Sequence, residues 1–148
     1  MKQDDMVSSL KNLFVPVIRR HGFKGSMPHF RRPTEDRINL LTVRFDRHGG
    51  GFVIEVSNCS PEGTTTPWGK HIPPNRVSAW DVYPPNRPRL GSSSPGEDDH
   101  WFRFDDGTST DEVAKLAVAY FERADQWWST ANPWWKEASR QLSPSHRP

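Results

Sequence analysis

Two arginines in a proline-rich stretch are the residues best suited to bind an anion. Arg87 and Arg89 flank Pro88, and the planar guanidinium group of arginine matches the oxygens of a carboxylate or a phosphate. We expect these side chains to hold an anionic ligand in a pocket between a sheet and the proline-rich stretch. Such a pocket would belong to a small enzyme or to a ligand-binding domain.

Tryptophans form a second group of candidates. Trp127–Trp128 and Trp134–Trp135 fall in expected helices, where neighbouring side chains diverge by about 100°, so the two rings of a pair cannot share one face. The rings either pack between helices, with Trp68 or Trp80 covering the outer ones, or form an exposed aromatic patch with arginines, as in protein interfaces. The candidate binding residues are therefore Arg87, Arg89, Trp101, Trp127, Trp128, Trp134 and Trp135.

The sequence does not indicate residues for catalysis, metal binding or a cofactor. The six histidines show no H-x-x-x-H spacing and no pairing with Cys59, whereas zinc needs three or four convergent ligands. Cys59 as a nucleophile would need a base such as His71 or His100 within reach, and a cysteine at a strand end is more often a small buried residue. We expect no catalytic residues, no metal and no cofactor.

The charges are unevenly distributed along the chain. Residues 16–48 hold eight lysines and arginines against three acids, and residues 97–125 hold nine acids against three lysines and arginines. The basic stretch could bind an anionic partner such as RNA, or the two stretches could complement each other within the fold. We favour internal complementarity, so a nucleic-acid partner is not expected.

Length and composition fit one domain without a membrane segment. The chain has 148 residues, the usual size of a single domain. It contains no run of about 18 apolar residues, which excludes a transmembrane helix, and its polar start does not resemble a secretory signal. A single cysteine fits a reducing compartment, so we expect a cytoplasmic location.

Apolar spacing predicts an amphipathic N-terminal helix and two C-terminal helices. Pro16 should disturb the first helix, and His21–Phe23 should end it because Gly22 can adopt a positive φ. Ser109–Glu112 matches a capping box before a strongly periodic helix, and Asn132–Pro133 starts another helix. The helical apolar residues are Met6, Leu10, Leu13, Phe14, Val17, Val113, Leu116, Ala117, Tyr120, Phe121, Ala124, Trp127, Trp128, Trp134, Trp135, Ala138 and Leu142.

Strands are predicted between these helices. We expect an edge strand at Met27–Arg31, because Pro28 cannot donate to a ladder, and a hairpin of Arg37–Asp46 with Phe52–Ser57 around a glycine-rich turn. Ile38 and Leu40 are out of phase with the rest of their strand, which indicates a bulge or burial on both faces.

Residues 60–99 contain eight of the 14 prolines, yet they also carry too many apolar residues for a solvated linker. We expect an ordered excursion over the sheet, with a short strand at Val77–Tyr83. A further strand should follow at His100–Phe104. The sequence thus predicts one α+β domain over 1–142, in which the helices pack mainly on one face of an antiparallel sheet, and a frayed tail over 143–148.

Several short motifs, in this order, resemble a known family. They are Gly22-Phe23-Lys24, Phe30-Arg31-Arg32, the hairpin, Arg87-Pro88-Arg89-Leu90-Gly91, Trp101-Phe102 and a helix ending in Trp127-Trp128. Together they resemble a widespread family of small bacterial proteins, the domain of unknown function four-three-zero-four, over roughly Val7 to Trp128. The family has no established activity, so the resemblance implies a fold and no mechanism.

Two functions remain as hypotheses. The first is a non-enzymatic module that binds another protein through aromatic and arginine side chains, with an immunity-type inhibitor as a special case by analogy to other small bacterial families. The alternative is the small enzyme or ligand-binding domain with an anion-holding pocket under the proline-rich stretch.

Overall fold

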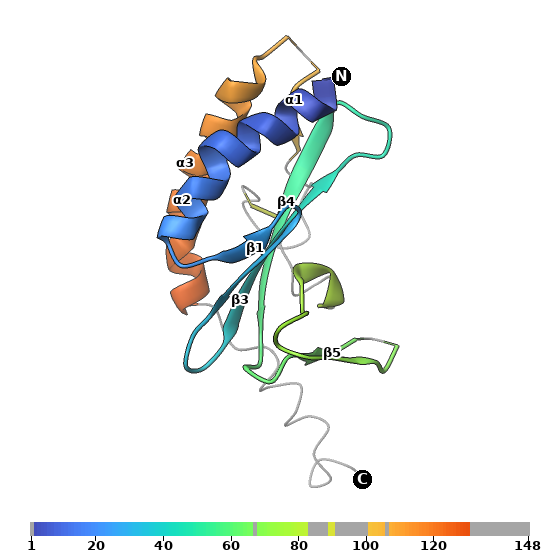
Figure 1. Ribbon diagram of the computed structural model, residues 1–148, viewed down its shortest axis with the longest axis vertical. Coiled ribbons are helices and arrows are strands. Elements are labelled where there is room, and N and C mark those ends of the chain that lie inside the picture. Colours follow the sequence, from blue (N-terminus) through green and yellow to red (C-terminus); the bar gives the residue numbers. More distant parts are fainter. Residues whose placement is uncertain (1, 67, 83–88, 91–100, 106, 131–148) are drawn as a thin grey trace, which may run out of the picture.

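A five-stranded antiparallel sheet lies at the centre of the structure, and the helices cover one of its faces (Figure 1). The computed structural model describes residues 2–66, 68–82, 89–90, 101–105 and 107–130. The strand order is β1-β2-β3-β4-β7, and a separate ribbon pairs β5 with β6. The strands are β1 (Lys24–Ser26), β2 (His29–Pro33), β3 (Ile38–Phe45), β4 (Gly51–Cys59), β5 (Thr64–Thr65), β6 (His71–Ile72) and β7 (Phe102–Arg103).

The N-terminal helical segment contains one wider turn. The helix α1 (Lys2–Ser9), a π turn, η1 (Leu10–Phe14), and the helix α2 (Val15–Arg20) follow one another directly. Pro16 has no N–H to donate to the fourth preceding carbonyl, and the π turn lies directly before it, where the regular hydrogen-bond pattern is already broken. The sequence predicts a kink or a loosened last turn at Pro16; the structure instead has the π turn before the proline, and the last turn, in α2, is a regular α-helix.

The predicted helix end and the predicted start of the C-terminal helix are both confirmed. Gly22 has a φ of +98°, which glycine adopts without a steric penalty, and the Phe23 N–H donates to the carbonyl of Ile18 (3.1 Å). At the start of α3 (Thr110–Thr130), the backbone N–H of Glu112 donates to Ser109 Oγ (3.1 Å).

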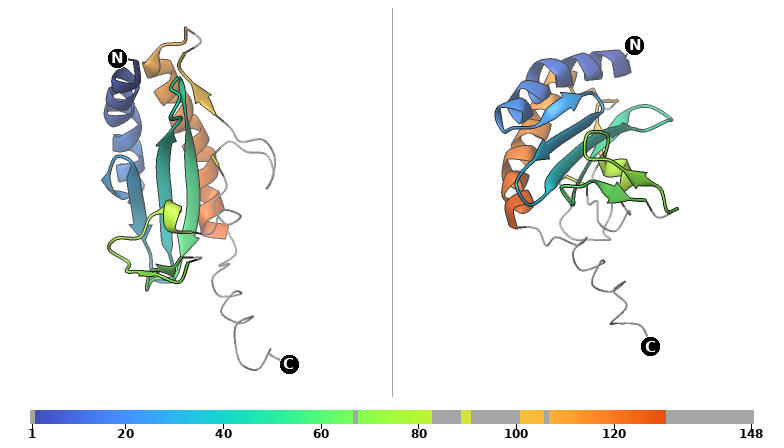
Figure 2. Two further views of the ribbon diagram at one scale, coloured as in Figure 1. Left: turned by 90° about the vertical axis from the view of Figure 1, so that its right-hand side faces the viewer. Right: turned by 60° about the horizontal axis from the view of Figure 1, so that its bottom comes forward.

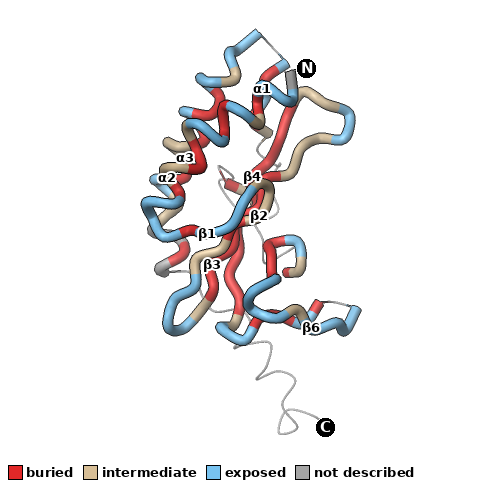
Figure 3. Tube along the Cα trace, in the orientation of Figure 1, coloured by how far each residue is buried: buried red, intermediate tan, exposed pale blue. Residues whose placement is uncertain are grey.

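The two helical segments pack against each other on the same side of the sheet (Figure 2). Ser9 Oγ donates to Asp111 Oδ1 (2.7 Å) and so joins the end of α1 to the start of α3. Buried positions run along the inner sides of the helices and through β3 and β4 (Figure 3). The largest side chains of this main core are Met6, Leu10, Phe14, Phe23, Phe30, Phe52, Phe102, Phe104, Phe121 and Trp128.

The predicted hairpin is confirmed, and its out-of-phase residues are buried on the second face of the sheet. β3 pairs with β4 in an unbroken register from Ile38 opposite Cys59 to Phe45 opposite Phe52, so there is no bulge between them. Ile38 and Leu40 face away from the helices and belong to a second core, which excludes water from that face. Its buried members are Ile38, Leu40, Cys59, Val77, Ala79 and Val82.

Two predicted strands are wrong in detail. The chain reverses at Met27–Pro28, a cis peptide bond, so residues 24–33 form two antiparallel strands and β1, not β2, lies at the edge. The proline sits in the turn, where no ladder donor is needed. The strand expected at Val77–Tyr83 is replaced by a 3-10 turn, η2 (Ala79–Asp81), and Tyr83 lies outside the described residues.

The α+β class with an antiparallel sheet is confirmed. Of the two predicted C-terminal helices, the structure describes α3, whereas the helix expected from Asn132 and the tail over 143–148 lie outside the described residues. The strand expected at His100–Phe104 is present as the shorter β7, and His100 also lies outside them. None of the helices in the described part of the chain combines the length and apolar character needed to cross a bilayer.

Candidate functional site

A cavity of about 420 Å³ lies between β2 and the segment of residues 70–81. One wall is formed by His29 and Arg31, alternate residues of β2 that share the face of the sheet opposite the helices. The other wall is formed by the excursion that begins after β4, which includes β6 and η2. We call this cavity the excursion pocket.

Buried apolar residues hold the outer wall of the excursion pocket against the sheet. Val77, Ala79 and Val82 are at most 2% exposed and pack on Ile38 and Leu40. A local cap then sets the η2 turn: Asp81 Oδ2 accepts a hydrogen bond from the backbone N–H of Ser78 (2.8 Å). Trp80 and Asp81, which lie between the buried residues Ala79 and Val82, keep part of their surface exposed and line the pocket.

Three cationic side chains line the excursion pocket without a partner. Arg31 is half-buried, and Lys70 and Arg76 are exposed. Within the described part of the chain, none of these three side chains forms a hydrogen bond or an ion pair. Asp81 is the acidic residue of the lining. The pocket therefore carries an excess of positive charge, which favours an anion.

His29 connects the excursion pocket to the sheet. Its Nδ1 lies 3.0 Å from Thr42 Oγ1 on the neighbouring strand, and its ring packs against Trp80 at 4.8 Å between centroids and 83° between planes. Burial lowers the pKa of His29, and the negative charge of Asp81 opposes this shift. The ring is thus biased towards the neutral imidazole, with Nε2 as the nitrogen not engaged by Thr42.

Arg32, the next residue of β2, pairs with α3 on the other face of the sheet. Its Nη1 lies 2.9 Å from Asp125 Oδ1 on α3, and its guanidinium group lies over the rings of Phe23 (4.7 Å) and Trp128 (5.6 Å). This ion pair joins the basic and acidic stretches of the sequence and bears out internal complementarity at this point. Arg31, on the opposite face, is left for the pocket.

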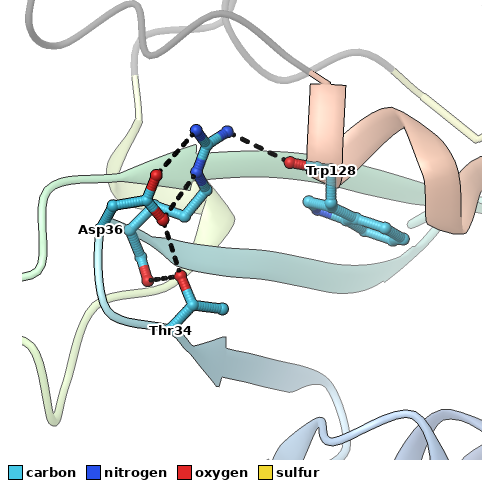
Figure 4. A network of polar contacts seen from close by, with 4 residues as sticks. Thr34, Asp36 and Trp128 are labelled. Atoms are coloured by element: carbon cyan, nitrogen blue, oxygen red, sulfur yellow. Dashed lines mark hydrogen bonds and ion pairs between the residues drawn. The ribbon is translucent and has the colours of Figure 1, made fainter.

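Trp128 is part of the core and not of an exposed patch. It is 0% exposed, and its Nε1 donates to the carbonyl of Ser57 (3.1 Å). Arg37 Nη1 donates to the main-chain oxygen of Trp128 (3.2 Å) and pairs with Asp36 (3.1 Å) at the β2–β3 turn (Figure 4). The same arginine lowers the pKa of Asp36. A binding role for Trp128 at the surface is therefore corrected to a structural one.

Arg89 and Trp101, the other predicted binding residues whose side chains the structure describes, are not part of the described lining of the excursion pocket. Arg89 forms an isolated bridge with Glu55 of β4, and its guanidinium group lies 5.3 Å from the ring of half-buried Trp101. Arg103 lies 5.4 Å from the same ring. The remaining candidates lie outside the residues whose side chains the structure describes: Arg87, Trp127, Trp134 and Trp135.

Cys59 and the histidines offer little for catalysis. Cys59 is buried in the second core, and burial raises the pKa of its thiol to about 12, so it stays protonated and unreactive. His71 also lines the excursion pocket, and its Nε2 lies 3.1 Å from the carbonyl oxygen of Glu62, just before β5. The described residues contain no group of three His, Cys, Asp or Glu side chains placed to share a metal ion.

Sequence reasoning missed the pocket residues Arg31, Lys70 and Arg76. In the sequence, Arg31 is one member of the basic stretch, and its residue type does not distinguish it from Arg32, which has a structural role. The usable signal was the alternation along β2, which places the two arginines on opposite faces. Lys70 and Arg76 depend on how the excursion folds over the sheet.

Comparison with known proteins identifies a family. No curated protein and no solved structure was found to match the chain. A family model matches residues 14–137, which include α2, the sheet, the excursion and α3. The chain therefore belongs to the family described as Domain of unknown function (DUF4304).

Proposed function

We propose that this protein is a binding domain for a small anionic ligand, which it holds in the excursion pocket. The observation that carries the proposal is a set of three cations, Arg31, Lys70 and Arg76, around a cavity of ligand size; their side chains have no partner among the residues that the structure describes. Like charges placed around one cavity repel each other, and a bound anion relieves that repulsion. The two guanidinium groups can each donate two parallel hydrogen bonds to a phosphate or carboxylate.

Binding fits the lining better than catalysis. Asp81 already accepts a backbone hydrogen bond as the cap of η2, and the buried thiol of Cys59 does not line the pocket. Catalysis by acyl or phosphoryl transfer would need a nucleophile beside a base. The lining has a hydroxyl near a carboxylate, Ser78 Oγ at 3.4 Å from Asp81 Oδ2, but both groups belong to the cap of η2. We therefore propose recognition without turnover.

Titration calorimetry with inorganic phosphate and with citrate tests the proposal. We expect both to bind the full chain at low salt, and binding to weaken as salt is raised. Arg31→Gln and Arg76→Gln should each weaken binding about 5-fold or more, because each removes one charge-assisted contact. The matched control is Arg20→Gln, at an exposed position of α2, and this variant should bind phosphate and citrate as the wild type does.

Two results would refute anion binding in this pocket. One is the absence of any binding of phosphate and citrate to the wild-type chain. The other is binding that Arg31→Gln, Arg76→Gln and Arg20→Gln leave equally unchanged, because the anion would then lie elsewhere.

A second candidate function is binding to another protein, with an immunity-type role as a special case. It is supported by Trp68, which is 71% exposed near the tip of the β5–β6 ribbon, since tryptophan is enriched at interface hot spots. We also propose a reducing, cytoplasmic location from the single buried cysteine. Trp68→Ser should abolish co-purification of a specific protein partner and leave phosphate binding unchanged. Retention of the partner would exclude Trp68 from the interface, and the absence of any partner of the wild-type chain would remove this candidate.

A further inference from the structure

We infer that the ligand of the excursion pocket is a nucleoside monophosphate, with its base stacked on Trp80 and its phosphate held by Arg31, Lys70 and Arg76. This inference rests on the proposed function and specifies its ligand. It combines the cationic lining with two further features of the pocket, which are an exposed but immobilised aromatic ring and a polar region between that ring and the cations.

Trp80 offers a flat apolar surface at the pocket. Its ring is 43% exposed, although its neighbour Ala79 and the following Val82 are buried in the second core. The perpendicular contact with His29 further restricts the ring. A heterocyclic base can stack on such an indole with little loss of side-chain entropy, and base stacking is tolerant of base identity.

The spacing along β2 separates an aromatic end from a cationic end. His29 and Arg31 are two residues apart on the same face, and a strand rises about 3.3 Å per residue, so they lie about 7 Å apart. Trp80 contacts His29, whereas Arg31 lies one step further along the strand. A sugar fits between a base at the first position and a phosphate at the second. The volume of about 420 Å³ suits one nucleotide.

Polar groups near Trp80 suit the hydroxyls of a sugar. His29 uses Nδ1 for Thr42, which leaves Nε2 for a ligand. Asp81 uses Oδ2 for Ser78, while its Oδ1 makes no hydrogen bond to the described residues. A carboxylate accepts hydrogen bonds from ribose hydroxyls and repels additional negative charge. Asp81 thus favours a monophosphate, with a neutral sugar beside it, over a longer phosphate chain.

A ligand series on the full wild-type chain tests this inference by calorimetry. Adenosine 5′-monophosphate should bind about 10-fold tighter than ribose 5-phosphate, because it adds one stacked base. Adenosine, which lacks the phosphate, should bind at least about 10-fold more weakly than the monophosphate. Equal affinity of adenosine 5′-monophosphate and ribose 5-phosphate would overturn the inference. If inorganic phosphate still bound in that case, anion binding would stand, whereas no binding of any of these probes would overturn both.

A matched pair of tryptophan variants locates the stacked base. Trp80→Leu should remove the roughly 10-fold advantage of adenosine 5′-monophosphate over ribose 5-phosphate and leave the affinity for inorganic phosphate unchanged. Trp68→Leu, at a more exposed ring outside the pocket lining, should keep that advantage. Circular dichroism confirms that each variant is folded, and the wild-type series decides the inference if Trp80→Leu is not. An advantage that survives Trp80→Leu in a folded variant would overturn the placement of the base.

Discussion

Replacement of Trp128 by phenylalanine tests whether this ring holds the sheet and the helices together. The indole is 0% exposed and its Nε1 donates to the carbonyl of Ser57. Ser57 lies in β4 opposite Leu40 of β3, so the hydrogen bond from the indole joins α3 to the middle of the sheet. Trp128→Phe keeps a ring but removes this donor and part of the volume.

The expected loss of stability follows from these two changes. Loss of a typical hydrogen bond costs about 0.5–1.5 kcal/mol. The smaller ring leaves a void of roughly 40 Å³, which at about 24 cal/mol per Å³ adds about 1 kcal/mol. We therefore expect Trp128→Phe to lower the free energy of unfolding by about 1.5–2.5 kcal/mol, a substantial part of the 5–15 kcal/mol that is typical of a domain.

Urea unfolding followed by far-ultraviolet circular dichroism measures this loss. With a typical slope of about 2 kcal/mol per M, the midpoint should fall by about 1 M. The matched control is Trp68→Phe at a ring that is 71% exposed, for which we expect a change within about 0.5 kcal/mol. Equal midpoints for the two variants would refute the assignment of Trp128 to the core.

Three further predictions concern other parts of the structure. Burial lowers the pKa of His29 below its ordinary 6.5, so the unfolded chain binds that proton more readily and the free energy of unfolding should fall as the pH drops below 6.5. The variant His29→Gln should show a smaller shift in urea midpoint between pH 7.5 and 5.5 than the wild type. An unchanged shift would contradict this. Gly63→Ala should destabilise the protein by at least about 2 kcal/mol, because φ is +101° and the new Cβ would overlap the Ile72 carbonyl. The control Gly49→Ala, at a positive φ in open space, should lower the stability measured in urea by only about 1 kcal/mol. Similar losses in the two variants would argue against the close approach of Gly63 to Ile72. Cys59 should resist a disulfide reagent at pH 8 until urea unfolds the chain, because its thiol pKa is about 12, and rapid modification of the native protein would contradict its burial.

Local sequence signals account for the main elements of the fold. The alternation in β3 and β4, the glycine at the end of α2 and the serine before α3 each act over a few residues, and each is confirmed. Burial of Ile38 and Leu40 on the second face was also open to sequence reasoning, because both break the alternation of their strand. Their partners, however, come from residues 77–82, and no local pattern indicates that contact.

The errors arise where distant segments decide the structure. The turn at Met27–Pro28 divides one expected strand into two, and the excursion adopts a 3-10 turn because Val77, Ala79 and Val82 bury themselves against β3 and β4. The sequence predicts an excursion that folds over the sheet, and the structure has a cavity between the excursion and β2. Its charged lining could not be predicted, since β2 contributes Arg31 while the excursion contributes Lys70 and Arg76.

Within residues 70–82, some side chains attach the segment to the sheet and others line the excursion pocket, and this affects how the ligand preference of the protein could change. Val77, Ala79 and Val82 attach the segment to the sheet, whereas the side chains of Lys70 and Arg76 form no hydrogen bond or ion pair with the described residues. Exchange of these two lining residues would alter ligand preference with little effect on folding. Specificity and foldability are therefore encoded by different side chains, and one scaffold can acquire new ligands by single substitutions.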